Sequence, residues 1–276
     1  MIDITNFTSS TPDNFDINLL QKEVDGGAVS VNQINECLEA NPTAKTIIIS
    51  GLKQEEFDYF IQTYGSRFEA ISFWKNKAVV DLSALGKLSR VKYINYFFNQ
   101  KATSLWDMSG NTALEGVGIY DFSKLHSIKE IETAPNLRFF GIGDMVWAGM
   151  EIESLKPVAN TGITHLEWCG KKVADGDFAC LANGKIETLD LNPTQFTIEE
   201  LTDLLALFPR DLKGSITKPY VSGSVSYKGK DEAERYYFLC KNKKKCVAGK
   251  DDERFAKYLK EFEEMLEQKR AGLGNN

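Results

Sequence analysis

This 276-residue chain contains two pairs of carboxylates in which the two members of each pair are 23 residues apart. Glu167 and Asp190 form one pair, and Asp121 and Asp144 form the other. On neighbouring parallel strands such residues would lie about 5 Å apart, where like charges raise one pKa or attract a cation. A pair this close could also supply the acid and the nucleophile of a glycoside hydrolase. No catalytic signature accompanies them, so we favour a solvated acidic surface and keep a hydrolase using Glu167 and Asp190 as an alternative.

Histidine and cysteine give weaker signals. His165 lies two residues before Glu167 and four before Cys169, but no second histidine completes a metal-binding set, so we interpret this group as contact surface. His126, beside Leu125, is interpreted as structural. Cys180 precedes Leu181 and is expected to behave as a small core residue.

The remaining cysteines predict neither zinc nor disulfides. Cys240 and Cys246 lack a second ligand pair, and a total of five cysteines suits reduced thiols and a cytoplasmic location. The glycine-rich stretch 141–144 lies within a predicted strand rather than between a strand and a helix, which argues against dinucleotide binding. We therefore predict no cofactor and no metal.

The charge and the hydropathy of the chain disfavour nucleic acids and membranes as partners. The net charge of −6 argues against binding to a phosphate backbone, and the lysine-rich run 241–245 is interpreted as a solvated loop. No apolar run is long enough to span a membrane, and the first residues lack the pattern of a signal peptide. We expect no nucleic-acid or membrane partner. A protein or peptide, with basic residues as the natural complement, is the expected ligand.

These residues lie in a repeated pattern. An apolar triplet with the spacing i, i+3, i+5 begins at residues 68, 91, 114, 137, 163 and 186, mostly at intervals of 23 residues, and a weaker copy begins at residue 44. A second apolar cluster precedes most triplets, as at Leu82, Leu85 and Leu88. Such a period predicts stacked units that share one core. Each unit would pair a strand with a short helical or irregular back turn.

Helices are predicted at both ends of this array. Ser30 and Gln33 form a capping box for a helix that ends before residue 41, and residues 52–64 form an amphipathic helix that ends at Gly65. A further short element is expected within residues 17–24, and partial disorder elsewhere in residues 1–27. A second capping box, Thr197 with Glu200, opens a helix that ends before Pro209. The last helix carries an apolar stripe that we expect to close the far end of the array: Phe255, Tyr258, Leu259, Phe262, Met265 and Leu266.

Residues between the triplet positions must point to the other side of the sheet, which we call the alternate face. Aromatic rings gather there, and such a surface is typical of recognition sites. The predicted binding residues on this face are Trp74, Tyr93, Asn95, Phe97, Tyr120, Phe139, His165, Glu167 and Asp190. Phe98 and Trp147 are expected at its rim, and Gly116, Gly118, Gly141 and Gly143 would open a trough beside the rings or relieve crowding where the rings pack. An alternative is that the C-terminal segment of the chain or long back loops cover these rings.

With its 23-residue period and the segment Asp81-Leu-Ser-x-Leu85-x-x-Leu88, the chain resembles short bacterial, internalin-like leucine-rich repeats over residues 44–196. The asparagine typical of the family stands at Asn76 and Asn99, whereas Phe122, Met145, Lys171 and Thr194 replace it in other units. The resemblance implies an α/β solenoid with a curved parallel sheet whose concave side, the alternate face, binds ligands.

We predict an N-terminal segment and cap at 1–43, a solenoid at 44–217 and a C-terminal cap at 218–276. The predicted function is that of a noncatalytic protein- or peptide-binding scaffold. A structural or immunity-type protein that binds through its C-terminal helix is a further alternative. The oligomeric state is not predicted.

Overall fold

A computed structural model describes residues 15–21, 27–146, 149–226 and 234–274. The chain divides into two compact units, residues 1–185 and 186–276, which are treated separately below. The predicted boundaries at 43/44 and 217/218 separate repeats from caps, and they stay a prediction.

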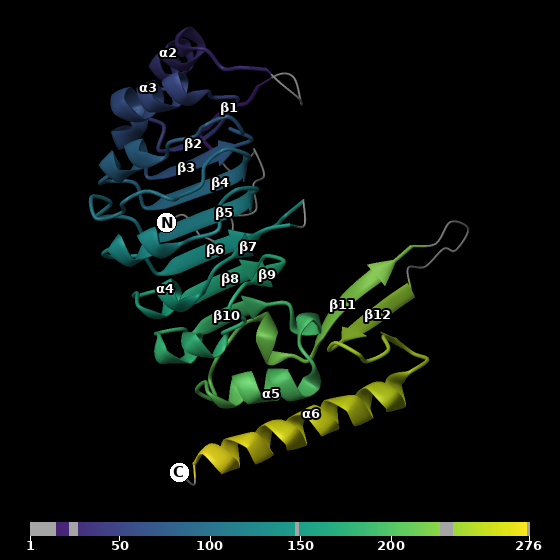
Figure 1. Ribbon diagram of the computed structural model, residues 1–276. Coiled ribbons are helices and arrows are strands. Elements are labelled where there is room, and N and C mark those ends of the chain that lie inside the picture. The colour runs from purple at the N-terminus through teal and green to yellow at the C-terminus, as the bar shows by residue number, and fades with distance from the viewer. Residues whose placement is uncertain (1–14, 22–26, 147–148, 227–233, 275–276) are drawn as a thin grey trace. The chain divides into compact units, whose positions relative to one another are not determined.

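The first unit is built on a parallel sheet whose strands follow one another in chain order (Figure 1). The strands are β1 (Ile17–Leu19), β2 (Thr46–Ser50), β3 (Ala70–Trp74), β4 (Tyr93–Asn99), β5 (Gly116–Phe122), β6 (Phe139–Gly143) and β8 (His165–Cys169). Equivalent triplet residues pair from strand to strand, as Ile71 with Ile94, Ile94 with Val117, and Val117 with Phe140. The predicted register is therefore confirmed, and the fold is an α/β solenoid of leucine-rich-repeat type.

The triplets form the core because strand side chains alternate between two faces. Val117, Ile119 and Ile142 are fully buried. Behind them lie the predicted back turns: η3 (Ser83–Lys87), η4 (Lys129–Thr133), α4 (Lys156–Ala159) and η5 (Ala179–Asn183). Their apolar residues, such as Leu85 and Ile131, are also fully buried, so each unit adds one layer to a continuous core. Two further short strands, β7 (Glu151–Ile152) and β9 (Lys172–Val173), pair with each other in parallel as a separate small sheet.

Two helices precede the regular repeats. Helix α2 (Val31–Ala40) begins with the predicted capping box, in which the Ser30 amide donates to Gln33 and the Gln33 amide donates to the Ser30 hydroxyl. Helix α3 (Gln54–Tyr64) runs into the single turn η2 (Gly65–Arg67). The apolar residues Phe57, Phe60 and Ile61 of α3 are buried. β1 falls inside the segment 17–24, where a short element was expected.

Buried asparagines tie the units together where the family pattern is present. The Asn99 amide nitrogen donates to the Val79 carbonyl at 2.9 Å, and its oxygen accepts from the amides of Lys101 and Ala102 at 2.8 Å. Asn111, on the back of the sheet, donates to the Leu85 carbonyl and accepts from the Trp106 indole. Asn111 lies outside the repeated motif, so the sequence pattern did not reveal its role.

The residue before the asparagine position adopts a left-handed backbone in three repeats, and Gly51 does so at the equivalent place before them. Gly51, Lys75, Phe98 and Asp121 have φ of 70°, 55°, 66° and 55°. Left-handed φ is uncommon for residues other than glycine, asparagine and aspartate, so its recurrence is a property of the repeat rather than of one side chain. Strands β2 to β5 thus end on the same turn.

The second unit begins with β10 (Thr188–Leu191), whose Leu189 is fully buried. It continues through η6 (Pro193–Gln195), α5 (Ile198–Ala206) and η7 (Ser215–Thr217) to the antiparallel strands β11 (Tyr220–Val225), β12 (Glu234–Leu239) and β13 (Cys246–Val247). Thr197 and Glu200 form the predicted capping box of α5.

The apolar stripe of the last helix, α6 (Asp252–Leu273), is used inside the second unit. The helix packs against α5, with Tyr258 and Phe262 buried. The Phe255 ring stacks on Tyr237 at 4.1 Å, and Arg210 makes a two-point contact with Glu267 at 2.7 and 2.8 Å. The stripe therefore has partners within its own chain. Among the described residues, no helix is both long and apolar enough to cross a membrane.

The Asn99 bonds lead to a test of stability. Replacing Asn99 by alanine leaves several buried backbone groups without their partner, so the free energy of unfolding should fall by about 2–4 kcal/mol. Urea denaturation measures this change. The exposed neighbour Gln100, replaced by alanine, is the control and should change stability by less than about 0.5 kcal/mol. Equal effects of the two substitutions would contradict the structural role of Asn99.

Candidate functional site: the alternate face of the repeat sheet

The alternate face of the first unit is closed in the centre, contrary to the predicted exposed aromatic row. Phe97, Tyr120 and Phe139 are between 0 and 4% exposed, and Asn95 is fully buried. Trp74 and Tyr93 are half-buried. The expectation of exposed rings is therefore wrong for the three central ones, and the predicted rim residue Trp147 lies outside the described residues. Whether this face binds a partner stays a prediction.

Neighbouring rings on this face pack against one another. Trp74 stacks on Phe97 with ring centres 4.3 Å apart and planes at 28°. Phe139 meets the His165 ring edge-on at 4.9 Å. At a margin of the face, the Tyr93 hydroxyl donates to Glu115 at 3.2 Å.

The glycines do not open the predicted trough. A Cβ on Gly141 would lie 2.0 Å from the Tyr120 hydroxyl oxygen, and one on Gly118 would lie 2.7 Å from the Tyr120 ring and from the Asn95 side-chain oxygen. The Tyr120 side chain therefore lies over Gly118 of its own strand and Gly141 of the next strand, where no side chains stand in its way. Of the two roles proposed for Gly118 and Gly141, relief of crowding agrees with the structure.

Beside Tyr120, the face becomes acidic. Burial raises the pKa of the Tyr120 hydroxyl well above its ordinary value, and the nearby Glu167 carboxylate raises it further. Burial, together with Glu167 and Asp144, raises the pKa of the Cys169 thiol to about 12. At neutral pH both groups keep their protons, so neither is prepared to act as a base or nucleophile.

The carboxylates of the hydrolase hypothesis belong to different units. Glu167 is half-buried on β8 of the first unit. Asp190, on β10 of the second unit, accepts a hydrogen bond from the Ser215 amide at 2.8 Å. Hydrolysis by this pair stays an alternative hypothesis. Loss of activity in a Glu167→Gln/Asp190→Asn variant that still binds its partner would favour it.

Asp121 and Asp144 shape a pocket of about 470 Å³ at the end of the strands. Its apolar wall includes Phe98, Phe122 and Met150. Asp121 is 5% exposed and accepts from the Val146 amide at 3.1 Å. Asp144 accepts from the amides of Gly149 and Met150, both at 2.9 Å. The backbone therefore fixes both carboxylates at the pocket.

The sequence revealed the equivalence of Asp121 and Asp144 but not their pocket. The left-handed turn at Phe98 and Asp121, which places these residues at the strand ends, is not encoded by glycine there. Met150 lies within the interval from residue 137 to residue 163, which departs most from the 23-residue period. That irregular spacing was the available signal.

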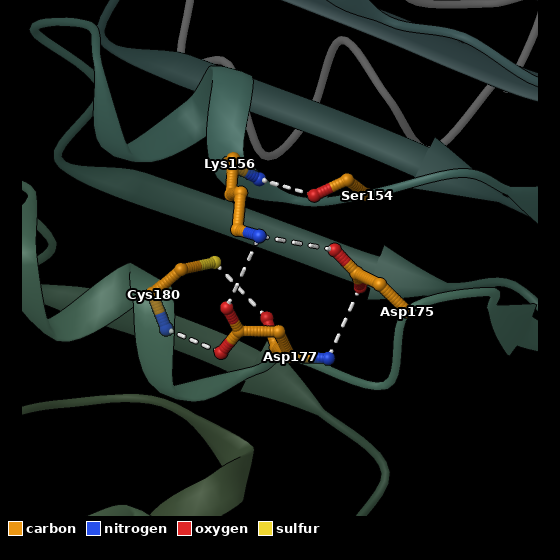
Figure 2. Close-up of polar contacts among 5 residues, drawn as sticks. All are labelled: Ser154, Lys156, Asp175, Asp177 and Cys180. Atoms are coloured by element: carbon orange, nitrogen blue, oxygen red, sulfur yellow. Dashed lines mark hydrogen bonds and ion pairs between the residues drawn. The ribbon is translucent and has the colours of Figure 1, made fainter.

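Polar residues on the back turns have structural roles (Figure 2). The Lys156 ammonium lies 3.8 Å from Asp175 and 3.7 Å from Asp177, and Asp177 accepts from the Cys180 amide at 3.1 Å. These contacts join α4 to η5. Cys180 is 8% exposed, which confirms its prediction as a core residue, and burial raises its thiol pKa to about 11.

His126 also serves a back turn, where its Nδ1 lies 2.8 Å from the Glu151 carbonyl oxygen. Across the described ranges, no three His, Cys, Asp or Glu side chains are grouped as a metal site would require.

Comparisons with known proteins give structural similarities alone. No family model matches the sequence, and no curated protein matches it. Among solved structures, the chain is similar to an internalin from Listeria monocytogenes, with a TM-score of 0.49 and 15% identity over 77% of this chain. It is also similar to a leucine-rich-repeat protein from Leptospira interrogans, with a TM-score of 0.42 and 14% identity over 77% of this chain. In both cases the match spans 56% of the other protein.

The stacked rings predict unequal effects of two substitutions. Phe97→Ala removes a buried ring and should lower the free energy of unfolding by about 3–5 kcal/mol, whereas the half-buried Trp74 should cost less when replaced by alanine. Chemical denaturation of each variant measures the difference. Near-wild-type stability of the Phe97 variant would show that its ring is surface rather than core.

Tyr120 and Gly141 predict a coupling. Gly141→Ala should destabilise the protein by about 1–3 kcal/mol because its methyl group collides with the Tyr120 hydroxyl. In a Tyr120→Ala background the same change should cost much less, since the colliding atoms are gone. A double-mutant cycle gives the interaction energy. Strict additivity would mean that the ring does not lie over Gly141.

Proposed function

We propose that the chain is a noncatalytic scaffold that binds a protein or peptide segment on the first unit, with the Asp121/Asp144 pocket receiving a basic side chain. The observation that carries the proposal is the combination of two fixed carboxylates with an apolar wall. Lysine and arginine have the matching form, an apolar stem that ends in a cation. The net charge of −6 favours the approach of such a partner.

The protonation state of two groups on the alternate face supports a noncatalytic role. The buried Tyr120 hydroxyl and Cys169 thiol have raised pKa values, so the protonated groups offer no ready base or nucleophile beside Glu167. Pre-formed concave and apolar sites with few polar groups are characteristic of binding. A repeat sheet also holds such groups rigidly, which limits the entropy lost on binding.

Panning a random peptide library on the full chain tests this function. We expect selected peptides to be enriched in lysine and arginine. Their affinity should fall about tenfold, or about 1.4 kcal/mol, when Asp121 or Asp144 is replaced by asparagine. Asparagine keeps the shape of aspartate and tolerates the left-handed backbone at position 121, so the substitution removes charge with little change in conformation.

Glu263→Gln is the matched control because it removes one negative charge from an exposed position of α6 in the other unit. Its binding affinity should equal that of the wild type. Selected peptides without basic residues, or equal affinity of all variants, would contradict the pocket as the binding site. Failure to select any peptide would contradict peptide binding by the scaffold.

A further inference from the structure

The small sheet of the second unit has an open edge at β11. In the part of the chain that the structure describes, the backbone of β11 pairs with β12 and with no other strand (Figure 1). The two strands pair residue for residue, from Tyr220 opposite Leu239 to Val225 opposite Glu234, without a bulge. Alternate residues of β11 therefore direct their N–H and C=O groups away from β12, where a further strand can pair with them.

Strand β11 lacks the features that usually keep an edge strand from pairing with another chain. Short length, charged side chains, proline and bulges are the common ones. The six residues of β11, Tyr-Val-Ser-Gly-Ser-Val, include neither a charged residue nor a proline. The opposite edge differs, because β13 is two residues long and follows the lysine-rich run 241–245. The β11 edge is therefore the less protected of the two.

Exposed apolar side chains lie along this edge on one face of the sheet. Val221 and Val225 are 38% and 39% exposed, and Phe238, opposite Val221 on β12, is 39% exposed. Helix α6 packs on the other face, where the Phe255 ring centre lies 5.0 Å from that of Tyr220. The turn η6 also comes close to β11 and β12, but it leaves the two valines and Phe238 exposed.

The sequence of β11 is symmetric about Gly223. Residues 221–225 read Val-Ser-Gly-Ser-Val in both directions, so two antiparallel copies that meet at Gly223 place the same residue types opposite each other. The opposite pairs are then Val221 with Val225, Ser222 with Ser224, and Gly223 with Gly223. Because side chains alternate along a strand, the valines meet on the exposed face and the serines on the α6 face. Paired valines bury apolar surface, and serine hydroxyls form hydrogen bonds across strands.

Gly223 leaves room for the Phe238 ring at the centre of this arrangement. A Cβ on Gly223 would lie 3.2 Å from the ring atom Cε2 of Phe238. On either side of the paired glycines, one apolar row runs across the sheet from Phe238 through Val221 to Val225 of the second copy. The antiparallel pairing therefore covers the apolar side chains that one copy leaves exposed.

We propose that two copies of the chain pair through antiparallel β11 strands about a two-fold axis at Gly223. A two-fold contact uses the same residues on both sides, and the symmetric sequence of β11 meets this requirement. Two six-residue strands meet over about 20 Å, a small contact beside the roughly 800 Å² per partner that standard complexes bury, so the pairing is weak. The dimer carries two Asp121/Asp144 pockets; their use rests on the proposed function, whereas the pairing does not.

Analytical ultracentrifugation of the full chain, without any ligand, measures the pairing. Between about 5 µM and about 500 µM protein, the average mass should rise from that of one chain toward that of two. The mass of a single chain at every concentration would overturn the proposal. Growth beyond two copies would also overturn it, because a two-fold contact is closed.

Two double substitutions test the register of the strands. Val221→Lys with Val225→Lys places like charges opposite each other, so the dissociation constant should rise at least about tenfold. Val221→Lys with Val225→Glu places opposite charges in both pairs, so this variant should still dimerise. Val80→Lys, at a position of the first unit that is 61% exposed, is the control for added charge and should behave as the wild type. Dimerisation of both double variants, or of neither, would overturn the pairing about Gly223.

Hydrogen exchange of the unmodified chain tests the same contact without relying on the folding of a variant. Amides within residues 220–226 should exchange severalfold more slowly at about 500 µM than at about 5 µM, because pairing protects those at the open edge. Peptides from the first unit should exchange equally at both concentrations. Equal exchange of residues 220–226, or concentration-dependent protection only elsewhere in the chain, would overturn the proposal.

Discussion

Parallel pairing of equivalent residues is the constraint on which the first unit depends. Because Ile71, Ile94, Val117 and Phe140 pair in sequence, every unit must present its apolar triplet to the same side. A shift of one residue would exchange the core and the alternate face. The turn at the ends of β2 to β5 is shared in the same way, and even Lys75 and Phe98 adopt a left-handed backbone there. The repeat therefore imposes a geometry that the individual side chains do not favour.

The sequence predicted the register, the back turns and both capping boxes because each depends on local spacing. The 23-residue period identifies residues that must be equivalent, and alternation within a strand assigns their faces. The same reasoning could not predict how exposed the alternate face is. The direction taken by the Tyr120 ring depends on the absence of side chains at Gly118 and Gly141, one on its own strand and one on the next. The side of the sheet to which a residue points follows the repeat period, whereas the exposed fraction of its side chain does not.

The acidic residues of the alternate face also could not be described fully from the repeat period. Asp121 and Asp144 occupy equivalent positions in the repeat, but their hydrogen-bond partners differ. Asp121 accepts from the amide of Val146, whereas Asp144 accepts from the amides of Gly149 and Met150. The difference comes from the irregular interval after β6, where the chain leaves the repeat geometry. Gly149 and Met150, two of the residues that line the pocket, belong to this irregular interval. The packing of Phe15 on Ile48 and Ala70 was not predicted for a related reason, since a single aromatic residue before the repeats has no period.

The state of the thiols has a consequence for oxidative chemistry. Peroxide reacts with the thiolate form of cysteine, and burial raises the pKa of Cys169, Cys180 and Cys240. These side chains therefore resist conversion to sulfenic acid at neutral pH. The same burial that places Cys169, Cys180 and Cys240 in the fold thus also disfavours the charged, reactive form of their thiols.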